Sequence, residues 1–284
     1  MGNCSYCGQP AGFLRSAHPD CSKKEKEKVA QASLGEGKII EAIAQGISAG
    51  SNLSVLDRSL ETMEQQYGIA PGRRHECLVR GWEKGVEAAL EDSILDESEE
   101  QRLLLFQQHF RLGQPDLNRN GHWMKITQAS VLREVLNGNI PTRVNLDGAV
   151  GINFQKGESI VWAFKDTKYL EDKTRRTFTG TSQGMSFRIA KGVYYRVGAF
   201  KGKPIETTER VHVDTGLLVV TDKNIYFSGP DKSIRVPYTK IVSFQPYSDG
   251  LGIMKDNATA KPQTFLTGDG WFVYNLVTNL SQIG

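Results

Sequence analysis

Hydrophobic residues follow two different periods along this chain, and the period changes near Pro141. From Ser22 to about Asn137, apolar residues recur every three or four positions, which places them on one face of an α-helix. After Pro141, apolar and polar residues alternate, which is typical of strands with one buried face. The pattern therefore predicts a helical part followed by a β-rich part.

The helical part contains about five predicted helices of roughly 10–20 residues each. Their apolar stripes are Ile39, Ile40, Ile43 and Ile47; Leu53, Leu56, Leu60, Met63 and Tyr67; Leu78, Trp82, Val86 and Leu90; Leu103, Phe106 and Phe110; and Ile126, Ala129, Leu132 and Leu136. Asp96 or Ser98 lies near the start of the fourth helix, and Asn137-Gly138 follows the last one. Short turns between such helices predict one helical domain, with Cys77 packed in its core.

The β-rich part has strand-like runs at residues 160–164, 185–189, 193–197, 217–220, 225–227, 234–236 and 241–244. Turn-forming residues separate several of these runs, as at 221–224 and 228–231. The final segment is helical again. Asp269 can cap a helix whose apolar face carries Phe272, Val273, Leu276, Val277 and Leu280. This order predicts antiparallel strands closed by an amphipathic C-terminal helix.

The first 21 residues are rich in Cys, Gly and Pro and too polar to form a hydrophobic core. They hold a CxxC pair and an HxxC pair, ten residues apart, that consist of Cys4, Cys7, His18 and Cys21. Both pairs can reach one tetrahedral ion, so the pattern predicts a zinc knuckle. Four protein ligands leave no open coordination position, which indicates structural Zn²⁺ and not a catalytic metal. Gly8, after Cys7, is expected at positive φ.

Two alternatives remain for this N-terminal segment. The four residues can be incidental polar residues near a terminus. Gly2 and Cys4 also suggest acylation of the N-terminus, although Tyr6 stands where the usual signal has Ser or Thr.

The overall charge is nearly balanced, with 35 basic against 32 acidic residues and a net charge of +3. This balance does not favour a nucleic-acid partner. The Lys23–Lys28 run alternates with glutamates and is typical of a solvated helix face. No apolar run approaches the ~20 residues that span a bilayer, and no secretory signal is present. Because three of the four cysteines crowd the first 21 residues, a reducing, cytoplasmic location is expected.

Catalytic and calcium motifs are weak in this sequence. His212 precedes Asp214 by two positions, and Gly180–Gly184 is glycine-rich, but neither is accompanied by a known catalytic signature. A strand histidine and a hairpin tip are the simpler interpretations. Asp116–Gly121 matches the first half of a calcium loop, yet Thr127 occupies the position of the bidentate glutamate. An ordinary turn between helices explains that segment.

The tail, from about Gly192 to Leu280, resembles bacterial pleckstrin-homology-like (GRAM-type) domains. The resemblance is carried by Thr215–Thr221, Ile225-Tyr226-Phe227, Ile234–Tyr238 and Ile241–Phe244. It implies two nearly orthogonal antiparallel sheets with one end plugged by a C-terminal helix. Some relatives bind phosphoinositides through basic residues of the first hairpin loop, and the nearest basic group here is Lys191, Arg196, Lys201 and Lys203. Residues 88–113 also resemble tellurite-resistance (TerB-like) helical domains, with lower specificity.

The sequence thus predicts an α+β multidomain protein: a zinc knuckle at 1–28, a helical domain at 29–140 and an antiparallel β PH-like domain with a C-terminal capping helix at 145–284. The leading hypothesis is a non-enzymatic adaptor that binds a protein partner or a membrane surface. One alternative is an enzyme with its site near His212 or Gly180–Gly184. Another is nucleic-acid binding through the knuckle, helped by Arg15, Lys23 and Lys24. The sequence does not specify the oligomeric state.

Overall fold

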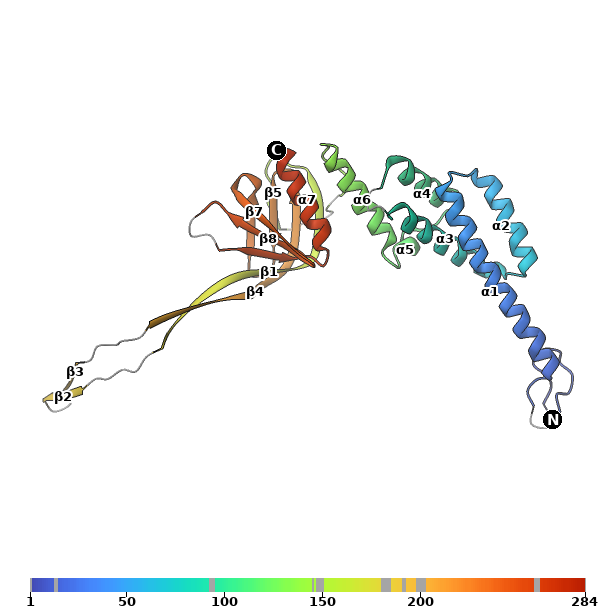
Figure 1. Cartoon of the computed structure of the whole chain (residues 1–284), viewed down its shortest axis with the longest axis horizontal. Coiled ribbons are helices and arrows are strands. Elements are labelled where there is room, and N and C mark those ends of the chain that lie inside the picture. Colours follow the sequence, from blue (N-terminus) through green and yellow to red (C-terminus); the bar gives the residue numbers. More distant parts are fainter. Residues whose placement is uncertain are drawn as a thin grey trace. The chain divides into compact units, whose positions relative to one another are not determined.

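The computed structural model describes residues 2–12, 15–91, 95–144, 146, 151–179, 185–190, 193–197, 203–257 and 261–283, with the backbone alone between 174 and 208. The chain forms two compact units, residues 1–133 and 134–284 (Figure 1). The architecture is mixed α+β, with an N-terminal Cys/His cluster, helices, and an antiparallel sheet followed by a C-terminal helix. This confirms the predicted fold class.

The first unit is helical. Its elements are α1 (Pro19–Ser48), α2 (Leu53–Tyr67), the 3-10 turn η1 (Pro71–Arg73), α3 (Arg74–Ala89), α4 (Glu97–His109) and the single turn α5 (Gln114–Leu117), and α6 (His122–Leu136) continues into the second unit. Side chains define two of the helix starts. Asn52 Oδ1 accepts hydrogen bonds from two backbone N–H groups at the start of α2. Asp96 and Glu99 form a capping box at α4.

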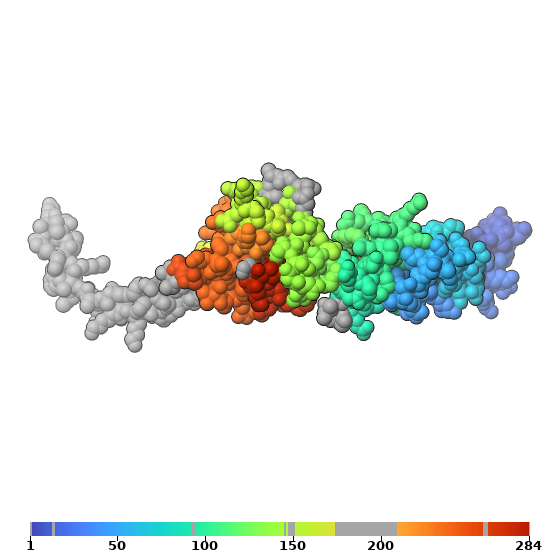
Figure 2. Space-filling view, turned by 90° about the horizontal axis from the view of Figure 1, so that it is seen from above, coloured from blue at the N-terminus to red at the C-terminus, as the bar shows by residue number. Residues whose placement is uncertain are grey.

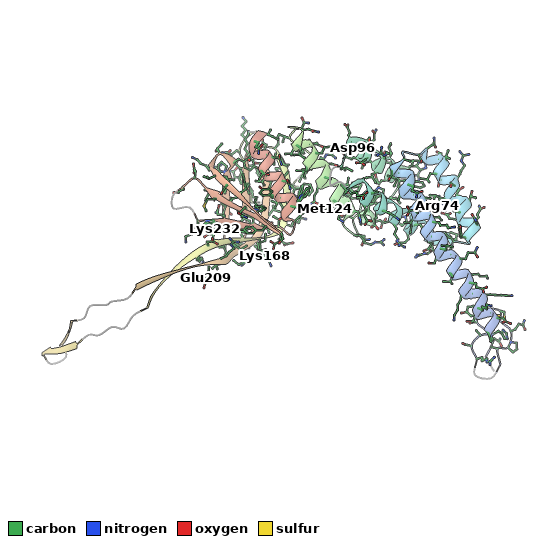
Figure 3. All side chains as sticks on the ribbon, in the orientation of Figure 1. Arg74, Asp96, Met124, Lys168, Glu209 and Lys232 are labelled. Carbon is green, nitrogen blue, oxygen red and sulfur yellow. The ribbon has the colours of Figure 1, made fainter. Side chains whose placement is uncertain are left out.

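The core of this unit is built largely from the predicted apolar stripes, and its fully buried side chains include Ile43, Trp82, Leu103 and Phe106. Leu136, predicted as part of the last stripe, is instead 58% exposed in the final turn of α6. Figure 3 shows how side chains fill the space between these helices. Cys77 is only 2% exposed and belongs to this core, as the sequence predicts. Helices α1 and α3 approach closely because α3 presents two glycines to α1. A Cβ on Gly81 would lie 2.6 Å from Ile43 Cβ, and one on Gly85 would lie 3.1 Å from Ile47 Cδ1.

Helix α1 runs without interruption across the boundary expected after residue 28. The first buried residue of this helix is Gly35. Residues 19–34 are exposed or half-buried, with Val29 and Leu34 among the exposed apolar side chains. Figure 2 shows these N-terminal residues, in dark blue, at the end of the first unit. The N-terminal half of α1 therefore derives little stability from packing.

The second unit contains a seven-stranded antiparallel sheet in the order β6-β5-β4-β1-β9-β8-β7. Its strands are β1 (Ile160–Thr179), β4 (Lys203–Thr221), β5 (Asn224–Ser228), β6 (Ser233–Pro237), β7 (Ile241–Tyr247), β8 (Gly250–Lys255) and β9 (Gln263–Leu266). The turn η2 (Tyr238–Lys240) connects β6 to β7. Strands β2 (Met185–Ala190) and β3 (Val193–Val197) pair separately as a two-stranded sheet. Two meanders, β1-β4-β5-β6 and β7-β8-β9, are thus joined through the β1–β9 pair.

Helix α7 (Gly270–Ile283) closes this unit as predicted. Asp269 Oδ1 accepts a hydrogen bond of 3.0 Å from the Phe272 backbone N–H and so caps the helix. The buried face carries the apolar residues that the sequence assigned to it, Phe272, Val273, Leu276, Val277 and Leu280. Phe272 packs edge-on against Trp162 of β1, with ring centroids 5.0 Å apart. Part of α7 remains at the surface (Figure 2), where Trp271 is 57% exposed.

Two carboxylates, the half-buried Glu158 and the buried Asp214, hold the loops of the second unit. Glu158 accepts hydrogen bonds from the Tyr226 hydroxyl at 2.6 Å and the Gln155 N–H at 2.7 Å, and from the Asn224 amide. Desolvation opposes ionisation of Glu158, but these hydrogen bonds outweigh it and lower its pKa. Asp214 accepts three backbone N–H groups, two of them from the turn at residues 231–232, and these bonds lower its pKa against the same desolvation. Both side chains are therefore carboxylates at neutral pH.

Candidate metal centre

The first ligand pair lies in a tight hairpin formed by residues 2–11. The Cys4 N–H donates to the Gln9 carbonyl at 2.7 Å, and the Gly8 N–H donates to the Cys4 carbonyl at 2.9 Å. Asn3 and Pro10 form an isolated antiparallel bridge. Gly8 has a φ of +73°, which confirms the positive φ expected after the CxxC pair. This hairpin directs the two cysteine side chains to the same side.

The second ligand pair lies at the start of α1. His18 is the N-cap residue, with extended backbone (φ −72°, ψ 144°), and Pro19 occupies the first helical position. Cys21 follows one turn later, on the same side of the helix start. The Ser5 N–H donates to the Ser16 carbonyl at 3.0 Å and joins the hairpin to the segment before the helix. These backbone contacts bring the two pairs together, and the described part of residues 2–18 contributes little apolar burial.

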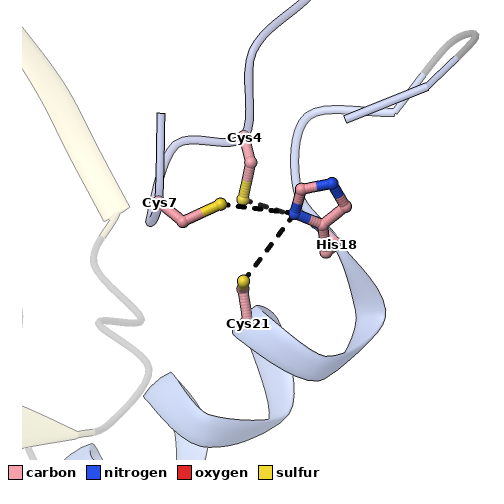
Figure 4. Close-up of side chains that lie close together, drawn as sticks. All are labelled: Cys4, Cys7, His18 and Cys21. Atoms are coloured by element: carbon pink, nitrogen blue, oxygen red, sulfur yellow. Dashed lines mark hydrogen bonds between the residues drawn. The ribbon is translucent and has the colours of Figure 1, made fainter. Parts of the chain in front are cut away.

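The four predicted ligands converge. One donor atom from each of Cys4, Cys7, His18 and Cys21 lies within 4.8 Å of the other three (Figure 4). His18 Nδ1 is 3.4 Å from Cys7 Sγ and 3.8 Å from Cys21 Sγ. A tetrahedral zinc site with Zn–S near 2.3 Å and Zn–N near 2.0 Å places its ligand atoms roughly 3.5–3.8 Å apart. The cluster needs to contract by about 1 Å at most to reach that geometry, so its residues fit a metal ion.

The orientation of the imidazole also suits a metal ligand. His18 Nε2 lies 3.0 Å from the Pro10 carbonyl oxygen. A carbonyl only accepts, so Nε2 carries the proton and donates it, and Nδ1 keeps its lone pair directed at the sulfurs. Histidines that bind metals usually donate their second ring N–H to an oxygen in this way, which fixes the tautomer. The Pro10 carbonyl thus holds His18 in the metal-binding form.

The thiols differ in their electrostatic surroundings. Hydrogen bonding from the His18 backbone N–H is the main cause that lowers the pKa of Cys4 to about 6. Desolvation, followed by the proximity of Cys7 and Cys4, raises the pKa of Cys21 to about 11. Three thiolates this close repel one another unless a cation lies between them. The donor set is therefore suited to a positively charged ion.

The residues considered for catalysis do not form such a cluster. The His212 side chain is exposed on β4, and its Nε2 lies 2.9 Å from Thr215 Oγ1. The Asp214 carboxylate accepts hydrogen bonds from the backbone N–H groups of residues 231 and 232. Gly180–Gly184 lies outside the described residues. The surroundings of His212 are those of an ordinary strand histidine with a satisfied hydrogen bond.

The calcium-like segment Asp116–Gly121 comprises the end of α5 and the turn that precedes α6, and its side chains form hydrogen bonds within the helical unit. Asp116 Oδ2 lies 3.1 Å from His75 Nε2, and Asn118 Oδ1 accepts from the Met124 N–H at 3.1 Å. Asn120 donates to Glu83 Oε1 at 2.9 Å. Because these side chains already form hydrogen bonds within the protein, the segment is best interpreted as an ordinary turn.

The basic group considered for lipid binding is only partly described. Lys191 and Lys201 lie outside the described residues. Arg196 lies on β3 and Lys203 begins β4, and only their backbone is described. Lipid binding by this group therefore stays a prediction.

Two features of the site were not predicted from the residue pattern: the position of His18 as the N-cap of α1, and the role of the Pro10 carbonyl. Pro19 gave a usable signal for the first of these, because proline is common at the first helical position. No residue pattern marks a backbone carbonyl as the partner of an imidazole.

No protein-family model matches this chain, and no curated protein matches it significantly. Across the described residues, no helix combines the length and apolar character needed to cross a membrane.

Proposed function

We propose that this chain is a non-enzymatic adaptor that uses a structural zinc knuckle and a PH-like module to bind a protein partner. The observation that carries the proposal is the convergence of three thiols and one imidazole within 4.8 Å. Sulfur and nitrogen donors in this number are typical of zinc. Because they complete a tetrahedral shell, the ion has no open position for a substrate.

Zinc supplies folding energy in this segment. Within the described part of residues 2–18, Cys4 and Ala11 are the side chains buried among hydrophobic ones, at 2% and 5% exposure. Such a small apolar contact does not offset the conformational entropy of ordering the hairpin. Binding energy from the metal is therefore folding energy for the knuckle.

Elemental analysis of the purified full chain tests this role. We expect about one zinc per chain, and loss of that zinc in the Cys7→Ser variant, because one of four ligands is removed. The matched control is Tyr6→Ala, since Tyr6 lies between two ligands but is 52% exposed. Tyr6→Ala should retain the metal. A metal-free chain with an ordered knuckle would contradict the proposal.

The second unit supports the PH-like part of the proposal. Two antiparallel meanders joined by the β1–β9 pair, with α7 packed on β7 and β8, are compatible with the resemblance. The resemblance implies two sheets, whereas these seven strands form one continuous sheet. In such modules, partners bind at exposed sheet edges and beside the terminal helix. The function proposed here is therefore recognition and not catalysis.

Strand β7 is the edge best placed for a partner. It lies at one end of the described sheet and pairs with β8 alone. Val242, near its start, is 66% exposed. Trp271 follows Gly270, whose backbone lies against the Tyr247 carbonyl at the other end of β7. Exposed apolar side chains thus flank an end strand of the described sheet, so we propose that an extended segment of a partner protein adds alongside β7.

Affinity capture from native cells, repeated with surface variants, tests this step. Val242→Asp and Trp271→Ala should reduce recovery of the same partner, because they change the two ends of the proposed edge. The control is Leu105→Asp, which alters an exposed apolar residue of the helical unit, 49% exposed. Equal recovery with all three variants would refute the β7 interface. Co-flotation of the chain with anionic liposomes would instead favour a membrane surface as the partner.

A further inference from the structure

Just over half of the 30-residue helix α1 stands outside the core of the helical unit. We call residues 19–34 the stem. All of its residues are exposed or half-buried, and burial in α1 begins at Gly35. At 1.5 Å per residue, the stem spans roughly 24 Å. The knuckle is attached to the far end of this stem, as Figure 1 shows.

Little in the described part of the unit holds the stem in helical form. Its side-chain hydrogen bond to α2 runs from Gln31 Nε2 to the Gln66 carbonyl at a long 3.4 Å. Gly35 and Gly37 lie between the stem and the packed half of α1, and glycine within a helix is less favourable than alanine. Isolated helices of this length are marginal in water. The packed half of α1 is therefore a weak source of helical order for the stem.

The metal cluster lies where a helix is normally capped. His18 is the N-cap residue, yet its side chain makes no capping hydrogen bond. Its imidazole faces the sulfurs instead, and Cys21, three residues later, is the fourth ligand candidate. A capping box links these same two positions of a helix through side-chain hydrogen bonds. An ion held by His18 and Cys21 would link them through coordination bonds.

The charge of an occupied cluster would also stabilise the N-terminus of α1. A divalent ion with three thiolates and a neutral imidazole carries a net negative charge, which is favourable at a helix N-terminus. Cys4 Sγ also accepts a hydrogen bond from the His18 backbone N–H at 3.4 Å, and Asp20 lies in the first turn. The occupied cluster would therefore stabilise the helix start both through coordination bonds and electrostatically.

We propose that metal binding at Cys4, Cys7, His18 and Cys21 controls whether residues 19–34 are helical. The inference rests on the metal binding proposed above. With the ion bound, the knuckle is carried on a rigid helical stem at a fixed distance from the helical core. Without it, the stem loses its N-terminal anchor and unwinds toward Gly35. The cluster then acts as a metal-dependent conformational switch in addition to its role in folding the knuckle.

Hydrogen–deuterium exchange of the full chain tests this switch. The chain is measured with Zn²⁺ bound and after removal of Zn²⁺ by a chelator, and the metal content of both samples is determined by elemental analysis. We expect amides of residues 22–34 to exchange on the order of tenfold faster after metal removal, while peptides from α3 are unchanged. Loss of zinc with no change in exchange at 22–34 would overturn the switch and leave the zinc knuckle intact. Failure to bind zinc at all would overturn both.

The Gly37→Ala variant gives a second measurement. Gly37 is exposed, and a Cβ there would meet nothing within 4 Å. The substitution should slow stem exchange in the metal-free protein several-fold, because alanine strengthens the helix next to the stem. Its zinc content should equal that of the parent chain. Unchanged stem exchange in this metal-free variant would count against the proposed unwinding.

Discussion

The close contact between α1 and α3 allows the stability change of a Gly81→Ala variant to be predicted. Replacing Gly81 with alanine puts a methyl group 2.6 Å from both Cβ and Cγ2 of Ile43. These atoms belong to the stiff, branched base of the isoleucine side chain, so they cannot move aside without a shift of the helix. Overpacking of this kind costs about 1–3 kcal/mol.

Alanine also improves the helix itself, which offsets part of that cost by about 1 kcal/mol. Because the contact involves Cβ, we expect an overpacking cost near the upper limit and a net loss of about 2 kcal/mol for Gly81→Ala. Gly85→Ala should be close to neutral, because its methyl group meets the flexible end of Ile47 at 3.1 Å. Gly37→Ala should stabilise the unit by up to about 1 kcal/mol, since its methyl group meets nothing.

Urea denaturation followed by circular dichroism at 222 nm measures this series, because the helical unit dominates that signal. A similar slope of the unfolding free energy against urea concentration in all variants would show that the unfolding transition itself is unchanged. The expected order of stability is Gly37→Ala, then the parent chain together with Gly85→Ala, then Gly81→Ala. If Gly81→Ala is as stable as Gly37→Ala, the close approach of α1 and α3 is wrong.

The remaining predictions concern the second unit. Glu158→Gln should destabilise it by about 1–3 kcal/mol, because the new amide N–H₂ faces groups that donate hydrogen bonds to the carboxylate. Denaturant-dependent hydrogen exchange of the β5 amides measures the loss, and no loss would contradict the network. Glu158 has a lowered pKa, so its contribution is complete above the unfolded-chain value of about 4.3 and disappears as pH falls through the lower folded value. The parent chain should therefore lose more stability than Glu158→Gln between neutral pH and about pH 3. Gly270→Ala should release α7, because a Cβ there would lie 1.9 Å from the Tyr247 carbonyl oxygen; protection of α7 amides equal to that of the parent chain would refute this.

The sequence determined those features that depend on near neighbours in the chain. The apolar stripes of the long helices and the buried face of α7 follow from spacing within one element, and the structure confirms them except at Leu136, which is exposed. The ligand pairs were also visible, because two residues between ligands is a local constraint that one tight turn satisfies. Cys77 was placed correctly in the core for a similar reason, since it belongs to an apolar helical face.

Tertiary structure decided the rest. Strands β8 and β9 were not predicted. They are short and largely buried on both faces, so buried and exposed residues do not alternate along them. The pairing of β1 with β9, and of Glu158 with Tyr226, joins residues far apart in the sequence, and no local period encodes such a partner. The Pro10 carbonyl that orients His18 is a backbone atom, which every residue has. Local sequence fixes which residues can share a face, whereas long-range packing and hydrogen bonding select which of those faces meet.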